Sequence, residues 1–198
     1  MPGSEQIPGE HLVTGSRIRA LLKSIDRDSN RGPTIILSRA DAQFVKLLFL
    51  QEVPEIETGT VEIKAIAREA GRRTKIAVYS SSSDIDPVGT FVGTKGVRVQ
   101  AVMNEIGDTE KIDIITYDHD IRNYIANALS PAEISRIDIN ESDKTATVYV
   151  TEAQQSVAIG RQGQNVRLAS QLTGYDIDIV RRSEERRVGK ECRSRWSP

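Results

Sequence analysis

The chain carries one short glycine turn twice, and each copy holds a single basic side chain. The two turns are Gly93-Thr94-Lys95-Gly96 and Gly160-Arg161-Gln162-Gly163. Glycine has no Cβ, so another backbone can pass close to such a turn. Amide groups at the start of a following helix favour an anion. Together with Lys95 or Arg161 these groups form a cradle for a phosphodiester, so the predicted chemistry is capture of a nucleic acid backbone.

The sequence around the two turns also matches. An aliphatic residue precedes each turn, a valine follows its second glycine by three positions, and a further glycine comes one helix length later. A short alternating apolar segment then closes each copy. Self-similarity of this extent indicates a duplicated structural unit. The matching positions are Val92, Val99, Gly107 and 112–115 in the first copy, and Ile159, Val166, Gly174 and 177–180 in the second.

The residue pattern predicts a helix on each side of each turn. Asp86 is a typical N-cap for a helix before the first turn, and residues 152–159 take the same place in the second copy. Apolar residues recur at helical spacing over 99–106. Gly107 and Gly174 stand where a left-handed residue commonly ends a helix. Each turn is therefore expected to join two helices.

The remaining segments complete two units with the same order of elements: helix, strand, strand, helix, loop, helix, strand. Apolar alternation predicts a hairpin in each unit, and the first hairpin turns at Gly71-Arg72-Arg73. Almost no linker separates the units, so we expect them to pack rigidly together and to present both loops on one continuous surface. The predicted first helices span 40–52 and 118–128, and the predicted hairpin strands span 61–67, 75–79, 134–139 and 145–150.

Helix, Gly-x-x-Gly, helix and strand in succession form the KH motif, whose loop clamps about four single-stranded nucleotides. The pair resembles the tandem KH domains of the NusA family of bacterial transcription elongation and termination factors. The resemblance covers roughly residues 12–180 and is carried by 86–102, 158–169, 52–56 and 127–132. It implies an α+β fold of tandem type II KH domains. Each domain would be a three-stranded mixed sheet packed on three helices, preceded by the last strands of an incomplete OB-type S1 barrel.

The resemblance divides the chain into an S1 remnant at 1–39, a first KH domain at 40–117 and a second at 118–181. Residues 1–10 are polar and are expected to form a loop or to be disordered. Strands are predicted at 17–25 and 34–37, too few for a complete barrel. The chain is therefore expected to be a fragment that lacks the family's domain for docking on RNA polymerase.

Residues 182–198 differ from the rest of the chain because they lack apolar periodicity and contain the one tryptophan. Two interpretations are open, a basic RNA-binding arm and a translated vector or assembly scar. The second is preferred, and the segment is expected to be a non-native disordered tail.

The charge balance predicts local rather than broad contacts with RNA. The net charge is −1, and the last eighteen residues hold seven basic and three acidic residues, which leaves 20 Lys and Arg against 25 Asp and Glu. A broad basic face is not expected from this balance, so binding should be moderate and involve few phosphates. The predicted RNA-binding residues are Gly93, Thr94, Lys95, Gly96, Arg98, Gly160, Arg161, Gln162, Gly163, Gln164, Asn165 and Arg167, with Arg72, Arg73 and Lys75 as further candidates.

Several of these residues have a second interpretation. Arg98 and Arg167 could be solvated side chains on a helix face, and Gln164 and Asn165 could be polar groups at a helix start instead of readers of base edges. The tyrosines are expected in the core or in strands. Aromatic residues make up 5% of the chain, so base recognition would use aliphatic grooves and hydrogen bonds.

Other classes of function find no support in the sequence. Neither turn fits a Walker sequence, no Gly-x-Gly-x-x-Gly occurs, and no catalytic triad can be assembled, so we expect no enzyme and no cofactor. The one cysteine, Cys192, excludes a disulfide framework and a cysteine metal site. The absence of a long apolar run or a secretory signal predicts a cytoplasmic protein with no membrane contact. The protein is also expected to be a monomer.

The resemblance implies a partner and a role. The chain would bind single-stranded nascent or leader RNA near the elongating RNA polymerase and modulate pausing, termination or antitermination. Two alternatives stay open: a KH pair that mainly contacts protein, and a scaffold of the ribosome or RNA-decay machinery with reduced RNA binding. The loop cation kept in both copies favours RNA.

Overall fold

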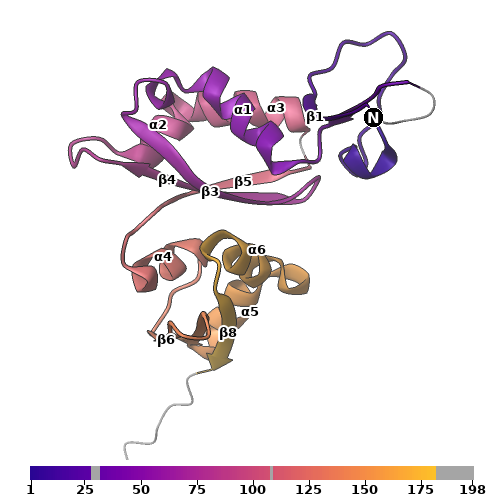
Figure 1. Ribbon diagram of the computed structural model, residues 1–198. Helices are drawn as coiled ribbons and strands as arrows, with labels where there is room; N and C mark the ends of the chain where they lie inside the picture. Colours follow the sequence, from indigo (N-terminus) through magenta and orange to yellow (C-terminus); the bar gives the residue numbers. More distant parts are fainter. Residues whose placement is uncertain (28–31, 108, 182–198) are drawn as a thin grey trace, which may run out of the picture.

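The computed structural model describes residues 1–27, 32–107 and 109–181, so the predicted tail at 182–198 lies outside the described residues. A two-stranded antiparallel hairpin, β1 (Leu21–Asp26) and β2 (Thr34–Ser38), precedes two α+β units. Figure 1 shows the hairpin beside the first unit and the second unit below it.

The first unit contains a three-stranded mixed sheet of order β3-β4-β5. β3 and β4 are antiparallel, whereas β4 and β5 are parallel. The three helices of this unit cover one face of the sheet (Figure 1). Its elements are α1 (Ala42–Glu52), η2 (Pro54–Ile56), β3 (Val61–Glu69), β4 (Arg73–Ser80), α2 (Pro87–Val92), η3 (Thr94–Gly96), α3 (Val97–Ile106) and β5 (Lys111–Thr116).

The second unit repeats this topology, with sheet order β6-β7-β8, an antiparallel β6/β7 pair and a parallel β7/β8 pair. The predicted duplication and the predicted α+β class, with three strands and three helices in each unit, are therefore confirmed. The elements are α4 (Ile121–Ala128), β6 (Arg136–Asn140), β7 (Thr145–Val150), α5 (Glu152–Ile159), η4 (Arg161–Gly163), α6 (Gln164–Thr173) and β8 (Asp176–Arg181).

Helix boundaries follow local sequence signals. The carboxylates of Asp41, Asp86 and Asp120 each accept a hydrogen bond from the amide two residues later and so cap α1, α2 and α4. Gly174 ends α6 in the predicted left-handed conformation. The same prediction for Gly107 is wrong, because its ψ of 149° leads the chain out extended toward β5 although its φ is positive.

The two units share one hydrophobic cluster. Ala67, Ala77 and Ile115 from the sheet of the first unit pack with Tyr124, Leu168 and other residues of the second. α6 lies against β3 and β4, and α4 lies against β5, so the first sheet has helices on both faces (Figure 1). The expected packing of the units against each other is thus confirmed.

The turn between β3 and β4 is held from inside by a buried carboxylate. Glu110 accepts from Arg68 Nε at 2.8 Å and from Arg68 Nη2 at 3.0 Å. It also accepts from Thr74 Oγ1 at 2.5 Å and from the Gly71 amide at 2.8 Å. A buried charge with this many donors orders the backbone around it, so the turn carries Arg72 in a defined position.

Of the two predictions for the N-terminal segment, a loop or disorder, the structure agrees with a loop that contains one short 3-10 turn at Gly3–Glu5. Residues 1–10 are not a disordered stretch: Ile7 is buried, and the amides of Arg39 and Ala40 both donate to the Glu5 carbonyl. Strand β1 begins at Leu21 and not at residue 17. One apolar side chain in a polar segment is a weak sequence signal, and here it anchors that segment on the first unit.

Leu168→Ala tests the shared cluster, because Leu168 is fully buried in it. We expect a loss of about 2–5 kcal/mol in the free energy of unfolding. Urea denaturation should show one transition for both units, since the cluster belongs to both. Leu47→Ala, which changes an exposed leucine on α1, should stay within about 0.5 kcal/mol of the parent. Two separate transitions, or equal losses in the two variants, would contradict the shared cluster.

Candidate nucleic-acid interface

The two Gly-x-x-Gly loops have the same backbone conformation. The first glycines, Gly93 and Gly160, lie at φ 75°, ψ 171° and φ 74°, ψ 176°. The third residues, Lys95 and Gln162, both have φ 54°. The second glycines are left-handed in both copies. Three of the four residues in each loop therefore have positive φ, which makes each loop a sharp corner between two helices.

The two glycines of each loop are needed for different reasons. A Cβ on Gly93 would lie 2.8 Å from Arg98 Cγ, and a Cβ on Gly160 would lie 2.7 Å from Asn165 Cβ. The φ and ψ of these first glycines also fall in a region that is essentially restricted to glycine. A Cβ on Gly163 would meet nothing within 4 Å, and a Cβ on Gly96 would only reach van der Waals contact with Val99 Cγ1 at 3.9 Å. The first glycine thus makes room for a side chain of the following helix, Arg98 or Asn165, while the second leaves open space outside the corner.

Of the two interpretations of Asn165, the structure supports a polar group at the helix start and not a reader of base edges. Its side chain is buried, and its amide group donates to the carbonyls of Leu129 at 2.9 Å, Ala158 at 3.1 Å and Val157 at 3.3 Å. These bonds tie the start of α6 to the end of α5. An amide committed in this way is not presented to a ligand.

Arg98 holds the corresponding place in the first unit, five residues after the first glycine. Its Nη1 donates to the Thr90 carbonyl at 2.8 Å, and its Nη2 donates to Glu55 Oε1 at 3.0 Å. The guanidinium therefore ties α3 back to α2, as the Asn165 amide ties α6 to α5. Arg98 thus has a structural role, which differs from both the phosphate contact and the solvated side chain considered from the sequence.

The second and third residues of both loops face solvent. Thr94, Lys95, Arg161 and Gln162 are all exposed. Among the turn, loop and cap hydrogen bonds between backbone groups of the described residues, none has one of these four amides as its donor. Lys95 and Arg161 also form no ion pair within the described part of the chain. Each loop thus offers two unpaired amides and one cation to the outside, a combination that suits an anion.

Gln164 and Arg167 make contacts between the units. Gln164 Nε2 donates to Glu69 Oε2 at 2.8 Å, and Arg167 Nε donates to Glu69 Oε1 at 2.6 Å. Hydrogen bonding to Arg167 lowers the pKa of the Glu69 carboxyl below its usual value. Arg167 Nη1 also reaches the Gln162 carbonyl at 3.4 Å. The second loop is therefore joined to strand β3 of the first unit.

The further cation candidates separate into three cases. Lys75 is fully buried between the units, where burial lowers its pKa and Asp113 opposes that shift, so its assignment to an RNA surface is wrong. Arg73 pairs with Asp113 at 2.6 Å. Arg72 is exposed, and its Nη1 lies 3.5 Å from Gln162 Oε1. Only Arg72 of these three is directed toward a loop.

Sequence reasoning missed Glu69 because a single acidic residue in a strand has no distinguishing pattern. It also missed an aromatic group beside the link between the units, where the Tyr117 ring packs edge-on against Tyr79, His119 and Tyr124. The Tyr124 hydroxyl donates to the Leu172 carbonyl at 3.0 Å, and burial raises its pKa. Tyr124 thus lies in the core, as expected for the tyrosines.

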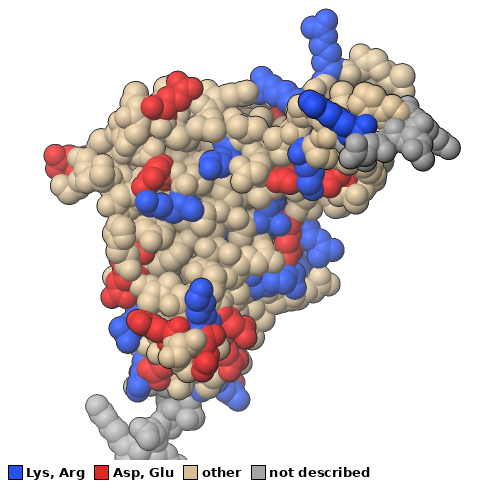
Figure 2. Space-filling view, in the orientation of Figure 1, with Lys and Arg blue, Asp and Glu red and all other residues tan. Residues whose placement is uncertain are grey.

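The visible surface carries mixed charge. In Figure 2, Lys and Arg side chains are interspersed with Asp and Glu, and both signs occur at the right-hand edge where α6 meets the first sheet.

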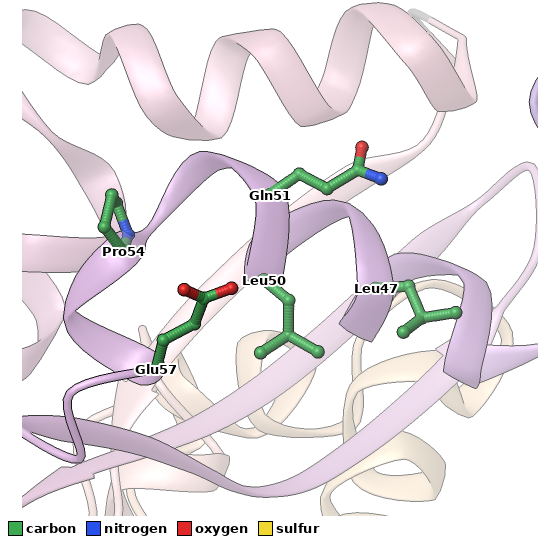
Figure 3. Close-up of a pocket in the computed structure, with 5 residues that line it drawn as sticks. All are labelled: Leu47, Leu50, Gln51, Pro54 and Glu57. Carbon is green, nitrogen blue, oxygen red and sulfur yellow. The ribbon is translucent and has the colours of Figure 1, made fainter.

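A hollow of about 320 Å³ lies on α1 and η2, lined by Leu47, Leu50, Gln51, Pro54 and Glu57 (Figure 3). It includes none of the predicted RNA-binding residues. Within the described residues, no His, Cys, Asp and Glu group suits a metal ion, and no helix is long and apolar enough to span a membrane.

Comparison with known proteins agrees with this architecture. Residues 39–117 match the family model of the NusA-like first KH domain, and residues 121–187 match that of the NusA-like second KH domain. The two matches follow in the order of the two observed units. This chain belongs to the NusA family.

Three NusA relatives show the extent of the similarity. The transcription termination/antitermination protein NusA of Thermus thermophilus is 52% identical over 177 residues, which are 89% of this chain and 45% of that protein. The proteins of the same name from Halalkalibacterium halodurans and Bacillus subtilis are 47% and 46% identical over 189 residues, 96% of this chain and 49% and 50% of theirs. The chain spans about half the length of these NusA relatives.

Substitution of the two glycines of the second loop should separate their roles. Gly163→Ala places an alanine in a left-handed conformation with open space and should cost about 1–2 kcal/mol of unfolding free energy. Gly160→Ala adds a clash with Asn165 to a glycine-only conformation and should cost about 3 kcal/mol or more. Urea denaturation measures both. Equal costs would show that the corner does not need the close approach at Gly160.

Glu69→Gln should make the free energy of unfolding less dependent on pH in the acidic range. Because the pKa of Glu69 is lowered in the folded protein, its contribution is present above the unfolded-state pKa of about 4.3 and is lost as the pH falls through the lower folded value. The difference in unfolding free energy between parent and variant should therefore be largest near pH 6 and shrink toward pH 3. A difference that stays constant over this range would contradict a functional Glu69–Arg167 pair.

Proposed function

We propose that this chain is the RNA-binding part of a NusA-type transcription factor and that it holds single-stranded RNA through its two Gly-x-x-Gly loops. The observation that carries the proposal is the duplicated corner. In both copies, two unpaired amides and one exposed cation lie outside a backbone with matching dihedral angles. KH loops clamp the backbone of about four nucleotides, and both copies here have the groups needed for that contact.

In this mechanism, the loops position the RNA and the helix–sheet surfaces read it. The amides of Thr94, Lys95, Arg161 and Gln162 would donate to phosphate oxygens, and the Lys95 and Arg161 side chains would neutralise part of the phosphate charge. Gly93, Gly96, Gly160 and Gly163 shape the two corners. Bases released from stacking would lie against the neighbouring apolar surface, in keeping with the few exposed aromatic residues. Binding of this kind requires no cofactor and no catalytic step.

The wider role rests on the family. The relatives are named transcription termination/antitermination proteins, and by analogy the chain would engage nascent or leader RNA beside the elongating RNA polymerase in the cytoplasm as a monomer. Residues 1–39, 40–117 and 118–181 would be the S1 segment and the first and second KH domains. Modulation of pausing, termination and antitermination would follow from holding the transcript.

Paired aspartate substitutions in the loops test the proposal. Asp tolerates the left-handed conformation found at Lys95 and Gln162, so Thr94→Asp with Lys95→Asp, and Arg161→Asp with Gln162→Asp, should leave circular dichroism unchanged. We expect each pair to weaken binding of a single-stranded RNA pool of about twelve nucleotides by about tenfold or more, because an attractive cation is replaced by repulsive anions. Fluorescence anisotropy with duplex RNA and single-stranded DNA as competitors provides the measurement.

Lys144→Asp is the matched control. Lys144 is also exposed and also has a left-handed φ of 50°, but it lies in the β6–β7 turn outside both loops. It should retain most of the affinity of the parent. If both loop variants bind RNA as tightly as the control does, the phosphate cradle is excluded and the alternative of a protein-interaction scaffold gains support.

A further inference from the structure

We infer that the first KH unit contributes Arg72 to the phosphate site of the second loop, so that this site is composite and spans the boundary between the units. The inference rests on the proposed RNA binding and extends it. Arg72 lies in the β3–β4 turn, and its guanidinium meets the side chain of Gln162, the third residue of the second loop. The sequence named Arg72 only as a further candidate cation of the first unit and did not connect it with the second loop.

The Arg72 backbone is held in place before any ligand binds. Its amide donates to the Glu69 carbonyl at 3.0 Å, and its carbonyl accepts from the Lys111 amide at 3.1 Å. The preceding Gly71 amide donates to the buried Glu110 carboxylate at 2.8 Å. The turn is therefore fixed on three sides, and only the Arg72 side chain is free to adjust. A preorganised backbone loses less entropy on binding, and here it keeps the Arg72 side chain near the second loop.

The local charge also favours an anion. Three arginines, Arg72, Arg161 and Arg167, surround the second loop or bond to it, whereas Glu69 is the carboxylate that pairs with one of them. Within the described residues Arg72 and Arg161 form no ion pair, although the charge of Arg72 also acts on Glu69 and helps to lower its pKa. Three arginines thus lie around one carboxylate beside the loop. Residues 1–180 as a whole contain more acidic than basic residues. Such a local excess of positive charge in an acidic chain indicates a site for a phosphodiester.

The space outside the corner fits the same ligand. A Cβ on Gly163 would meet no atom within 4 Å, so a nucleic acid backbone can approach that side of the loop. Arg72 Nη1 and Gln162 Oε1 are 3.5 Å apart and exposed. That contact is weak enough to be exchanged for a phosphate oxygen. An RNA strand held by the second loop would then run alongside the β3–β4 turn of the first unit.

Arg72→Ala in the full chain tests the inference, and Lys144→Ala is its matched control. Lys144 holds the corresponding place in the second unit: it precedes β7, and its carbonyl accepts from Asp176 at the start of β8, as that of Arg72 accepts from Lys111 at the start of β5. Both variants remove one exposed cation. Every variant keeps residues 182–198, so any RNA contact of that basic segment is common to all of them.

The probe is the single-stranded RNA pool of about twelve nucleotides, and its affinity is measured over a series of salt concentrations. We expect Arg72→Ala to weaken binding by about three- to tenfold and to lower the salt slope by about 0.7, the value for one phosphate contact on a single strand. Lys144→Ala should change neither quantity appreciably. Arg72→Lys should recover part of the affinity, because it restores the charge without the planar fork.

Arg161→Ala, measured in parallel, distinguishes a failure of the composite site from a failure of the proposed RNA binding. If Arg161→Ala weakens binding and Arg72→Ala does not, the composite site is wrong while the proposed function stands. If neither variant nor the loop aspartates affect RNA binding, the proposed function itself fails. If Arg72→Ala and Lys144→Ala weaken RNA binding equally, the effect of Arg72 is only that of removing one positive charge from the protein, and the inference is overturned. Thermal melting of each variant by circular dichroism confirms that it is folded.

Discussion

The candidate site depends on one constraint, the close approach of the second helix to the first glycine of each corner. Arg98 and Asn165, each five residues after that glycine, occupy the space that a Cβ would need, and each donates hydrogen bonds to carbonyls of the preceding helix. This contact fixes the angle between the helices. The third residue of each corner has a positive φ, and the two middle residues of each corner, one of which carries the cation, are exposed.

The same geometry is reached with different side chains in the two copies. An arginine paired with Glu55 ties the helices in the first unit, and a buried asparagine ties them in the second. The two loops share their protein backbone conformation but not the side chains around it. Both should therefore bind the same group of an RNA strand, its phosphodiester backbone, in different surroundings. The second loop has the additional link through Glu69 to the first unit, so its environment is determined by the packing of the two units as well as by its own sequence.

Much of the fold could be predicted because periodic apolar residues and capping signals are local: the element order, the duplicated corner and the α2 cap at Asp86 all follow from them. Side-chain direction could not. Lys75 looks like a solvated cation in a strand, but strand alternation places it on the face that the second unit covers. Asn165 and Gln164 are adjacent polar residues at a helix start, yet one points inward and the other toward Glu69. Those outcomes depend on tertiary packing between segments far apart in the sequence.

Backbone amide chemical shifts during titration with single-stranded RNA test the central claim most directly. In two-dimensional ¹H–¹⁵N spectra of the labelled chain, the amides of Thr94, Lys95, Arg161 and Gln162 should show the largest changes, since they are the groups proposed to donate to the RNA phosphates. The account is contradicted if these four signals stay in place while the RNA shifts amides elsewhere, such as those of the α1 hollow.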